Sequence, residues 1–118
     1  MGESGNRRIL ITGALGQIGM ELLNALQTKF GHDSVIASDI KDPMDVEDLD
    51  FRYEKLDVLD SEQMENIIRD NSINEVYHLA ALLSATGEKN PKLCLEININ
   101  GLMNVLELAR KYKFRIFA

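Results

Sequence analysis

A glycine-rich turn near the start of the chain constrains its fold more than any other feature. An apolar run, Ile9–Ile11, leads into three glycines that are each separated by two residues, Gly13, Gly16 and Gly19. Apolar residues at helical spacing follow them: Ile18, Leu22, Leu23, Ala25 and Leu26. This pattern predicts a strand, a tight turn and then a helix that runs from Gln17 to Phe30.

Such a turn is suited to binding a phosphate group. Glycine allows unusual backbone angles, lets a phosphate approach the backbone, and lets a helix pack closely on a strand. The free N–H groups and the positive dipole end of a helix that begins near Gln17 favour an anion. Three spaced glycines also occur in ordinary strand-to-helix turns, so the glycines alone leave both interpretations open.

An acidic residue after the next apolar run favours a dinucleotide. Val35–Ser38 ends at Asp39, twenty residues after Gly19. In a dinucleotide-binding βαβ unit, an acidic residue at the tip of the second strand accepts hydrogen bonds from the adenosine ribose, and its charge repels a 2′-phosphate. We therefore expect NAD rather than NADP as the cofactor. The alternative is that Asp39 only caps a helix or a turn.

Composition limits the remaining classes of function. The chain has 118 residues, enough for one domain, and a net charge of −6 without a basic stripe, so we expect no nucleic-acid partner. A single cysteine, Cys94, excludes an internal disulfide, and its leucine neighbours indicate a packed helical thiol rather than a nucleophile. Because no apolar run is long enough to span a bilayer and no signal peptide is visible, we expect a cytoplasmic protein without a membrane partner.

The rest of the chain alternates strand and helix patterns. We expect further strands at 51–58, 75–81 and 114–118, and helices at 61–71 and 91–113. Alternation of this kind predicts an α/β fold with a parallel, doubly wound sheet and right-handed crossovers, in the strand order 3-2-1-4-5. The switch point between strands one and four then brings together the glycine turn and the small residues Ala80 and Ala81.

Several residues at the expected carboxyl edge of this sheet are candidate ligand contacts. Asp57 can accept the exocyclic amino hydrogen of an adenine, with Val58 against the ring, although Asp57 also suits a turn toward the next helix. The small residues after the fourth strand allow a ligand to lie against the backbone, which makes candidates of Leu79, Ala80 and Ala81.

Three polar residues admit a structural and a functional interpretation. A histidine inside a buried strand, such as His78, is more often a hydrogen-bonded core residue than a catalytic one. Asparagine is a poor helix former, so Asn98 and Asn104 need a reason to lie in the last helix. We expect Asn98 to reach the cofactor, and simple exposure is the alternative.

Together these residues make the chain resemble the extended, or epimerase-type, short-chain dehydrogenase/reductase family. The resemblance covers nearly the whole chain and rests on Thr12-Gly13-x-x-Gly16-x-x-Gly19, Asp39, Leu56-Asp57-Val58, His78-Leu79-Ala80-Ala81 and Asn98-Ile99-Asn100-Gly101-x-x-Asn104-Val105-Leu106-Glu107. It implies that residues 1–118 form an NAD-binding domain of the Rossmann type.

Within this family, segments 11–19, 80–85 and 88–91 look most like the NAD-dependent L-threonine 3-dehydrogenases of bacteria. These enzymes oxidise the 3-hydroxyl of L-threonine to 2-amino-3-oxobutanoate. The resemblance implies that Ser84 helps to hold this small-molecule substrate, and that the full-length protein is a homodimer built partly on helix 91–113. It also implies an NAD site lined by Gln17, Ile18, Asp39, Ile40, Asp57, Val58, Leu79, Ala80 and Ala81.

The sequence departs from the family in one important respect. Family chemistry uses a Tyr-x-x-x-Lys pair, in which the tyrosine takes the hydroxyl proton. None of Tyr53, Tyr77 and Tyr112 has a lysine four residues later. We therefore expect no catalytic residue and no metal site in 1–118, which we interpret as the amino-terminal part of a longer enzyme, truncated after the fifth strand and inactive alone. The alternatives are an NAD-dependent sugar-nucleotide epimerase or dehydratase, and a non-catalytic NAD-sensing module.

Overall fold

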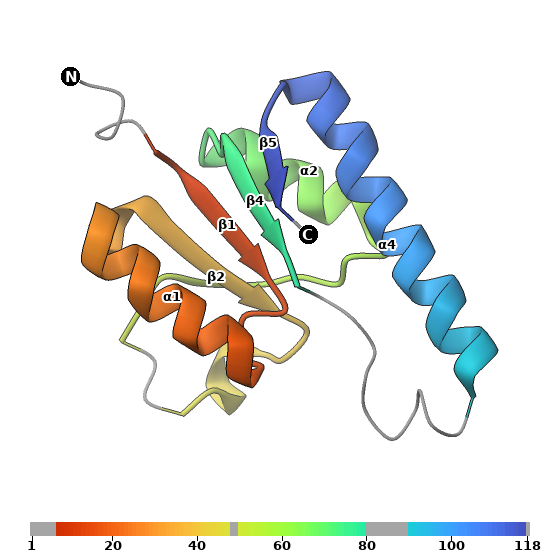
Figure 1. The fold of residues 1–118 in the computed structure, drawn as a ribbon, viewed down its shortest axis with the longest axis horizontal. Coiled ribbons are helices and arrows are strands. Elements are labelled where there is room, and N and C mark those ends of the chain that lie inside the picture. The colour runs from red at the N-terminus through yellow and green to blue at the C-terminus, as the bar shows by residue number, and fades with distance from the viewer. Residues whose placement is uncertain (1–6, 48–49, 80–89, 118) are drawn as a thin grey trace.

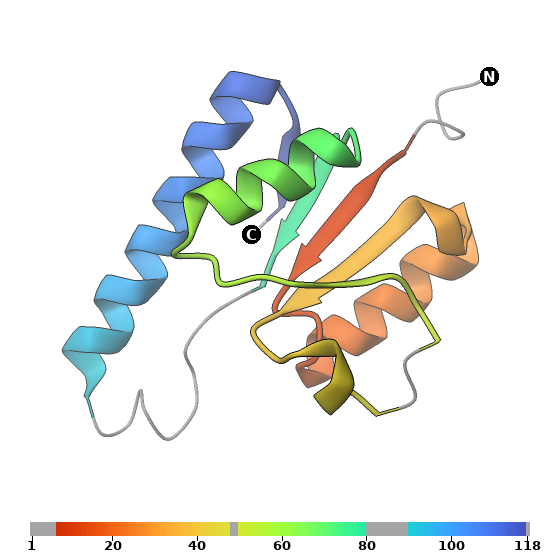
Figure 2. The same ribbon diagram turned by 180° about the vertical axis from the view of Figure 1, so that it is seen from behind.

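A computed structural model of the protein describes residues 7–47, 50–79 and 90–117, which form one sheet with helices on both faces (Figures 1 and 2). The strands are β1 (Ile9–Thr12), β2 (Val35–Asp39), β3 (Tyr53–Lys55), β4 (Glu75–His78) and β5 (Arg115–Phe117). The α-helices are α1 (Gln17–Phe30), α2 (Ser61–Asp70) and α4 (Pro91–Tyr112), and two short 3₁₀ turns are η2 (His32–Ser34) and η3 (Pro43–Asp45).

The sheet has the order that the sequence predicts. The strands lie in the order β3-β2-β1-β4-β5, and every neighbouring pair is parallel. Strand β1 is central, with Ile9 opposite Val35 on one side and opposite Glu75 on the other. The carboxyl ends of β1, β2 and β4 therefore reach the same edge of the sheet, where the glycine turn begins.

Alternating side chains of β1 divide the core into two halves. Ile9 and Ile11 pack with Leu23 of α1, whereas Leu10 packs on the other face with residues of α2 and α4. All of these β1 side chains are 0% exposed. The division follows from the two-residue period of a strand, and it places α1 on one face of the sheet and both α2 and α4 on the other (Figures 1 and 2).

The helix boundaries follow from capping residues. Helix α1 has the predicted bounds and ends at Gly31, whose φ of 97° few other residues adopt and whose N–H donates to the Gln27 carbonyl at 2.8 Å. Asp60 caps α2 by accepting from the Gln63 N–H at 3.1 Å. Both ends agree with the sequence, because these capping signals lie within a few residues of the helix.

Two predicted strands are shorter than expected. The third ends at Lys55, because the Asp57 carbonyl accepts the Asp60 N–H at 2.8 Å and closes a turn before Val58 can extend the strand. The fourth ends at His78, although the Leu79 N–H still donates to the Thr12 carbonyl at 3.0 Å. None of the helices in the described part of the chain combines the length and apolar character needed to cross a bilayer.

We predict that Gly19→Ala destabilises the fold. The new Cβ would lie 2.6 Å from the Ala14 carbonyl oxygen, and the carbon atoms of that residue's backbone are 2.7 Å away. Because backbone atoms cannot rotate aside, we expect the upper part of the range of about 1–3 kcal/mol that overpacking costs. The better helix propensity of alanine, roughly 1 kcal/mol, offsets only part of this loss. Urea unfolding would measure the change.

Gly16→Ala is the matched control, since its Cβ would meet nothing closer than the Gly13 carbonyl oxygen at 3.7 Å. Because Gly16 is the N-cap of α1, where alanine is less favourable than glycine, this change should lower the free energy of unfolding by less than about 1 kcal/mol, which is a smaller loss than for Gly19→Ala. A Gly19→Ala protein as stable as the parent would contradict the account of close packing at Gly19.

Candidate cofactor site

The three glycines of the turn have different structural roles. Gly13 has a φ of 71°, which favours glycine, and Gly19 lies too close to the Ala14 backbone to carry a side chain. Gly16 is different, because its φ is −72° and a Cβ there would make only an ordinary contact of 3.7 Å. The packing of the protein therefore does not require glycine at this position. A ligand group that approaches the backbone from outside would require it.

The amino terminus of α1 is open toward the same region. Its N-cap residue is Gly16, which has no side chain to bond the first N–H groups of the helix, and its first turn contains no acidic residue. Gln17 is exposed, and Ile18 is 72% exposed although it is apolar. The first N–H groups of a helix lack partners within the helix and carry its positive dipole end. This end fits the negative pyrophosphate of a dinucleotide.

Asp39 joins the glycine turn to the tip of β2. Its Oδ2 accepts from the Leu15 N–H at 3.0 Å and its Oδ1 from the Ile40 N–H at 2.7 Å, and the Ala14 N–H donates nearby to the Ser38 carbonyl at 3.0 Å. Asp39 therefore caps local backbone groups, as the alternative interpretation suggested. A carboxylate has about four lone-pair positions, so two donors leave capacity for the ribose hydroxyls of the predicted role.

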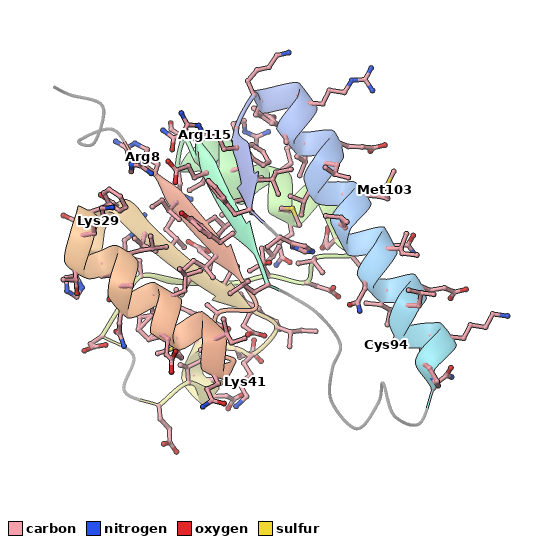
Figure 3. The ribbon with its side chains drawn as sticks, in the orientation of Figure 1. Arg8, Lys29, Lys41, Cys94, Met103 and Arg115 are labelled. Carbon is pink, nitrogen blue, oxygen red and sulfur yellow. The ribbon has the colours of Figure 1, made fainter. Side chains whose placement is uncertain are left out.

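The side chains beyond Asp39 continue this edge. Ile40 is 61% exposed, and Figure 3 places Lys41 at the end of the molecule where α1 begins, away from Arg8 and Arg115. The Tyr53 hydroxyl donates to the Lys41 carbonyl at 2.7 Å. A basic side chain thus lies near the predicted ribose site, next to the acid that is expected to repel a 2′-phosphate.

Tyr53 and Tyr77 are unsuited to proton abstraction. Burial, followed by the charges of Asp39 and Asp42, raises the pKa of Tyr53 to about 12. Burial, followed by the charge of Glu75, also raises the pKa of Tyr77. A tyrosine that takes a proton near neutral pH needs the opposite shift, so neither of these two side chains fits the role of general base.

The turn after β3 shows a structural role for Asp57. Its Oδ1 accepts from the Leu59 N–H at 3.0 Å, and its own N–H donates to Gln63 Oε1 at 3.0 Å. Asp57 therefore turns the chain toward α2, as the alternative interpretation of this residue suggested. The Asp57 side chain remains exposed, while Val58 is half-buried and its carbonyl accepts from Asn104 Nδ2 at 2.8 Å. The contact of this turn with adenine stays a prediction.

His78 has the hydrogen-bonded core role that its strand position favours. Its Nδ1 lies 2.9 Å from Thr12 Oγ1, and the Leu79 N–H donates to the same hydroxyl oxygen at 3.1 Å. Burial lowers the pKa of His78, so the ring is neutral at physiological pH. These bonds join the ends of β1 and β4 next to the glycine turn, which begins at the residue after Thr12.

The remaining predicted residues are only partly visible. Ala80, Ala81 and Ser84 lie outside the described residues. Asn98 is half-buried on α4, and its Nδ2 donates to Cys94 Sγ at 3.7 Å. Cys94 is half-buried, but Leu93 and Leu95, whose apolar character led us to expect a packed thiol, are exposed. Among the residues whose positions are described, no group of three or more His, Cys, Asp or Glu side chains is arranged to hold a metal ion.

The structure also identifies supporting groups that the sequence did not indicate. The glycine turn, Asp39 and Leu79 lie at one edge of the sheet, and they are connected through the Leu15 N–H and the Thr12 hydroxyl. Leu15 contributes through its backbone, which leaves no signature in its residue type. Thr12 directly precedes Gly13, and this position was its only signal.

A comparison with protein families identifies the chain. The model of the NAD dependent epimerase/dehydratase family matches residues 9–118. The chain belongs to this family. NAD is thus the cofactor, as Asp39 and the glycine turn predicted, and the open end of α1 and the uncrowded Gly16 fit its pyrophosphate.

Individual proteins are similar to nearly the whole of this chain. An uncharacterized epimerase/dehydratase of Staphylococcus saprophyticus is 46% identical over 112 residues, which are 94% of this chain and 35% of the relative. A structure described as a monomeric L-threonine 3-dehydrogenase from a metagenome is 55% identical with a TM-score of 0.85, over 93% of this chain and 35% of that chain. A UDP-glucose 4-epimerase of Thermotoga maritima is 31% identical with a TM-score of 0.78, over 93% and 37%.

We predict that His78 makes the stability of the protein depend on pH. Burial holds its pKa below the ordinary value of 6.5, so the unfolded chain binds a proton at a higher pH than the folded protein does. The free energy of unfolding should therefore be highest above the unfolded pKa and should fall as the pH drops from about 6.5 toward the folded pKa. Urea unfolding at about pH 7.5 and about pH 5.5 would measure this loss.

His78→Gln removes the ionisable group and should reduce the loss between the two pH values. The matched control is His32→Gln, which changes the exposed histidine of η2 and should preserve the parent's loss. If His78→Gln retained the full loss, the account of a buried neutral His78 would be wrong.

Proposed function

We propose that this chain is the NAD-binding part of an L-threonine 3-dehydrogenase, which oxidises L-threonine to 2-amino-3-oxobutanoate by hydride transfer to NAD. The observation that carries this proposal is a difference in identity. Each match covers 93% of the chain, with 55% identity to the L-threonine 3-dehydrogenase and 31% to the UDP-glucose 4-epimerase. Since the chain spans only 35% of the dehydrogenase, the activity is proposed for the whole protein.

The phosphates of NAD are assigned to the glycine turn. In this assignment the pyrophosphate lies against Gly13 and Gly16 and accepts hydrogen bonds from the N–H groups of Gln17 and Ile18. Gly19 contributes indirectly by letting α1 pack on the turn, since its Cβ position is only 2.6 Å from the Ala14 carbonyl oxygen. The open helix end and the room at Gly16 support this placement.

The adenosine and nicotinamide halves are assigned to the neighbouring strand ends. Asp39 accepts the ribose hydroxyls beside Ile40, and Asp57 and Val58 contact the adenine. Toward the nicotinamide, the proposed contacts are Leu79, Ala80, Ala81 and Asn98, with Ser84 on the substrate. The parallel strands place Thr12, Asp39 and His78 at the same edge of the sheet, which supports this order of contacts.

In this mechanism the residues of the chain bind and orient, while NAD supplies the hydride acceptor. Tyr53 and Tyr77 have raised pKa values, and no tyrosine of the sequence has a lysine four residues later. We therefore assign the acceptance of the threonine hydroxyl proton to a base outside residues 1–118. We expect the 118-residue chain alone to produce no NADH.

A cytoplasmic homodimer of the full-length protein completes the proposal. Helix α4 exposes large apolar side chains at helical spacing, and Figure 3 shows Met103 projecting away from the sheet. The exposed large apolar side chains of this helix are Leu93, Leu95, Ile99, Met103 and Leu106. Burial of this face against a second copy would remove it from water. The similar metagenome enzyme is described as monomeric, so the oligomeric state of this protein needs its own measurement.

The deciding experiment measures NADH formation by the product of the complete gene that contains this sequence. We expect absorbance of NADH to rise only when both L-threonine and NAD are present, with UDP-glucose in place of threonine as the control. A protein that binds NAD but forms no NADH from threonine would overturn the proposal in favour of sugar-nucleotide chemistry. Turnover by the isolated 118-residue chain would contradict the absence of a base.

In ultracentrifugation of the same preparation, a species of monomer mass would exclude the dimer.

A further inference from the structure

The turn that follows β3 is held in place by a distant helix. Asn104 of α4 donates from Nδ2 to the Val58 carbonyl at 2.8 Å, across 46 positions of sequence. Asn104 is half-buried, and asparagine lowers the stability of a helix interior. The hydrogen bond to the turn gives a physical reason for this residue at that place.

A second α4 residue acts on the same turn. A Cβ at Gly101 would lie 2.9 Å from Val58 Cγ2 and 4.0 Å from His78 Cε1. Glycine therefore allows the helix to pack directly on the Val58 side chain. Residues three apart share one face of a helix, so Gly101 and Asn104 reach the turn together.

The turn is also fixed from within and from α2. The Leu59 N–H donates to Asp57 Oδ1, the Asp60 N–H donates to the Asp57 carbonyl, and the Asp57 N–H donates to Gln63 Oε1. Despite these bonds the side chains of Asp57 and Leu59 are exposed. A backbone held at several points that presents exposed side chains is a preorganised surface, which binds a ligand without first having to be ordered.

We infer that Asn104 and Gly101 are positioning residues for the adenine end of the NAD site. They fix the position of Val58, and the position of Val58 fixes that of the neighbouring Asp57. In this position the Asp57 carboxylate accepts a hydrogen bond from the exocyclic amino group of the adenine. The consequence is selectivity for adenine over a purine that lacks this amino group. The inference rests on the proposed function only in placing the adenine of NAD at this turn.

The test compares two dinucleotides that differ only in the base. Nicotinamide hypoxanthine dinucleotide has a carbonyl where NAD has the exocyclic amino group. We expect the complete gene product to bind NAD more tightly than this analogue in calorimetry. Asn104→Asp keeps the shape of the side chain but places an acceptor against the Val58 carbonyl. It should weaken NAD binding by about three- to tenfold and bring the ratio of the two affinities close to one.

Two further variants separate positioning from stability. Gly101→Ala improves helix propensity but displaces Val58. We therefore expect the melting temperature of this variant not to fall, whereas its NAD affinity and its base selectivity should both fall. Asn100→Asp makes the same chemical change as Asn104→Asp at an exposed position of α4 and should behave like the parent. A purely structural role for Asn104 and Gly101 would weaken both dinucleotides equally.

The outcomes distinguish the two claims. If the parent protein binds no NAD, the proposed function fails and the inference fails with it. If the parent binds NAD but does not prefer it to the hypoxanthine analogue, the inference alone is overturned. The same holds if Asn104→Asp and Gly101→Ala both retain the parent's selectivity.

Discussion

The hydrogen bond between the Asp39 carboxylate and the Leu15 N–H is the contact on which the site depends. It joins residues 24 apart at a distance of 3.0 Å, because β1 and β2 pair with Thr12 opposite Ser38 and bring their ends together. A turn that departs from regular structure needs partners for its N–H groups, and Asp39 supplies one. The acid proposed to bind the ribose therefore also shapes the turn proposed to bind the pyrophosphate.

Much of the fold could be predicted because its signals are local and agree with one another. The apolar period of α1, the glycine turn before it and Gly31 after it fixed both helix ends. The alternation of strand and helix patterns, with right-handed crossovers, predicted the strand order without any long-range contact. Asp60 and Ser61 both suited the cap of α2, and the structure shows that Asp60 accepts from the Gln63 N–H.

The site was less predictable, because its supporting contacts join distant parts of the chain. The length of β3 depends on the turn that Asp57 closes, and residue type alone could not separate this role from an adenine contact. The partner of Asn104 lies 46 residues away, so the sequence showed only that the asparagine needed a reason. For His78, the bond to Thr12 and the surrounding burial decide between the two interpretations.

We propose that Asp39 selects NAD over NADP through its negative charge at the ribose. The most direct measurement is calorimetric titration of the complete gene product with NAD and with NADP, for the parent and for Asp39→Asn. Asp42→Asn, which removes an exposed acid paired with Lys55, is the matched control. We expect the parent and the control to prefer NAD by at least about tenfold, roughly 1.4 kcal/mol, and Asp39→Asn to lose most of this preference. Equal affinities of the parent for NAD and NADP would contradict this proposal.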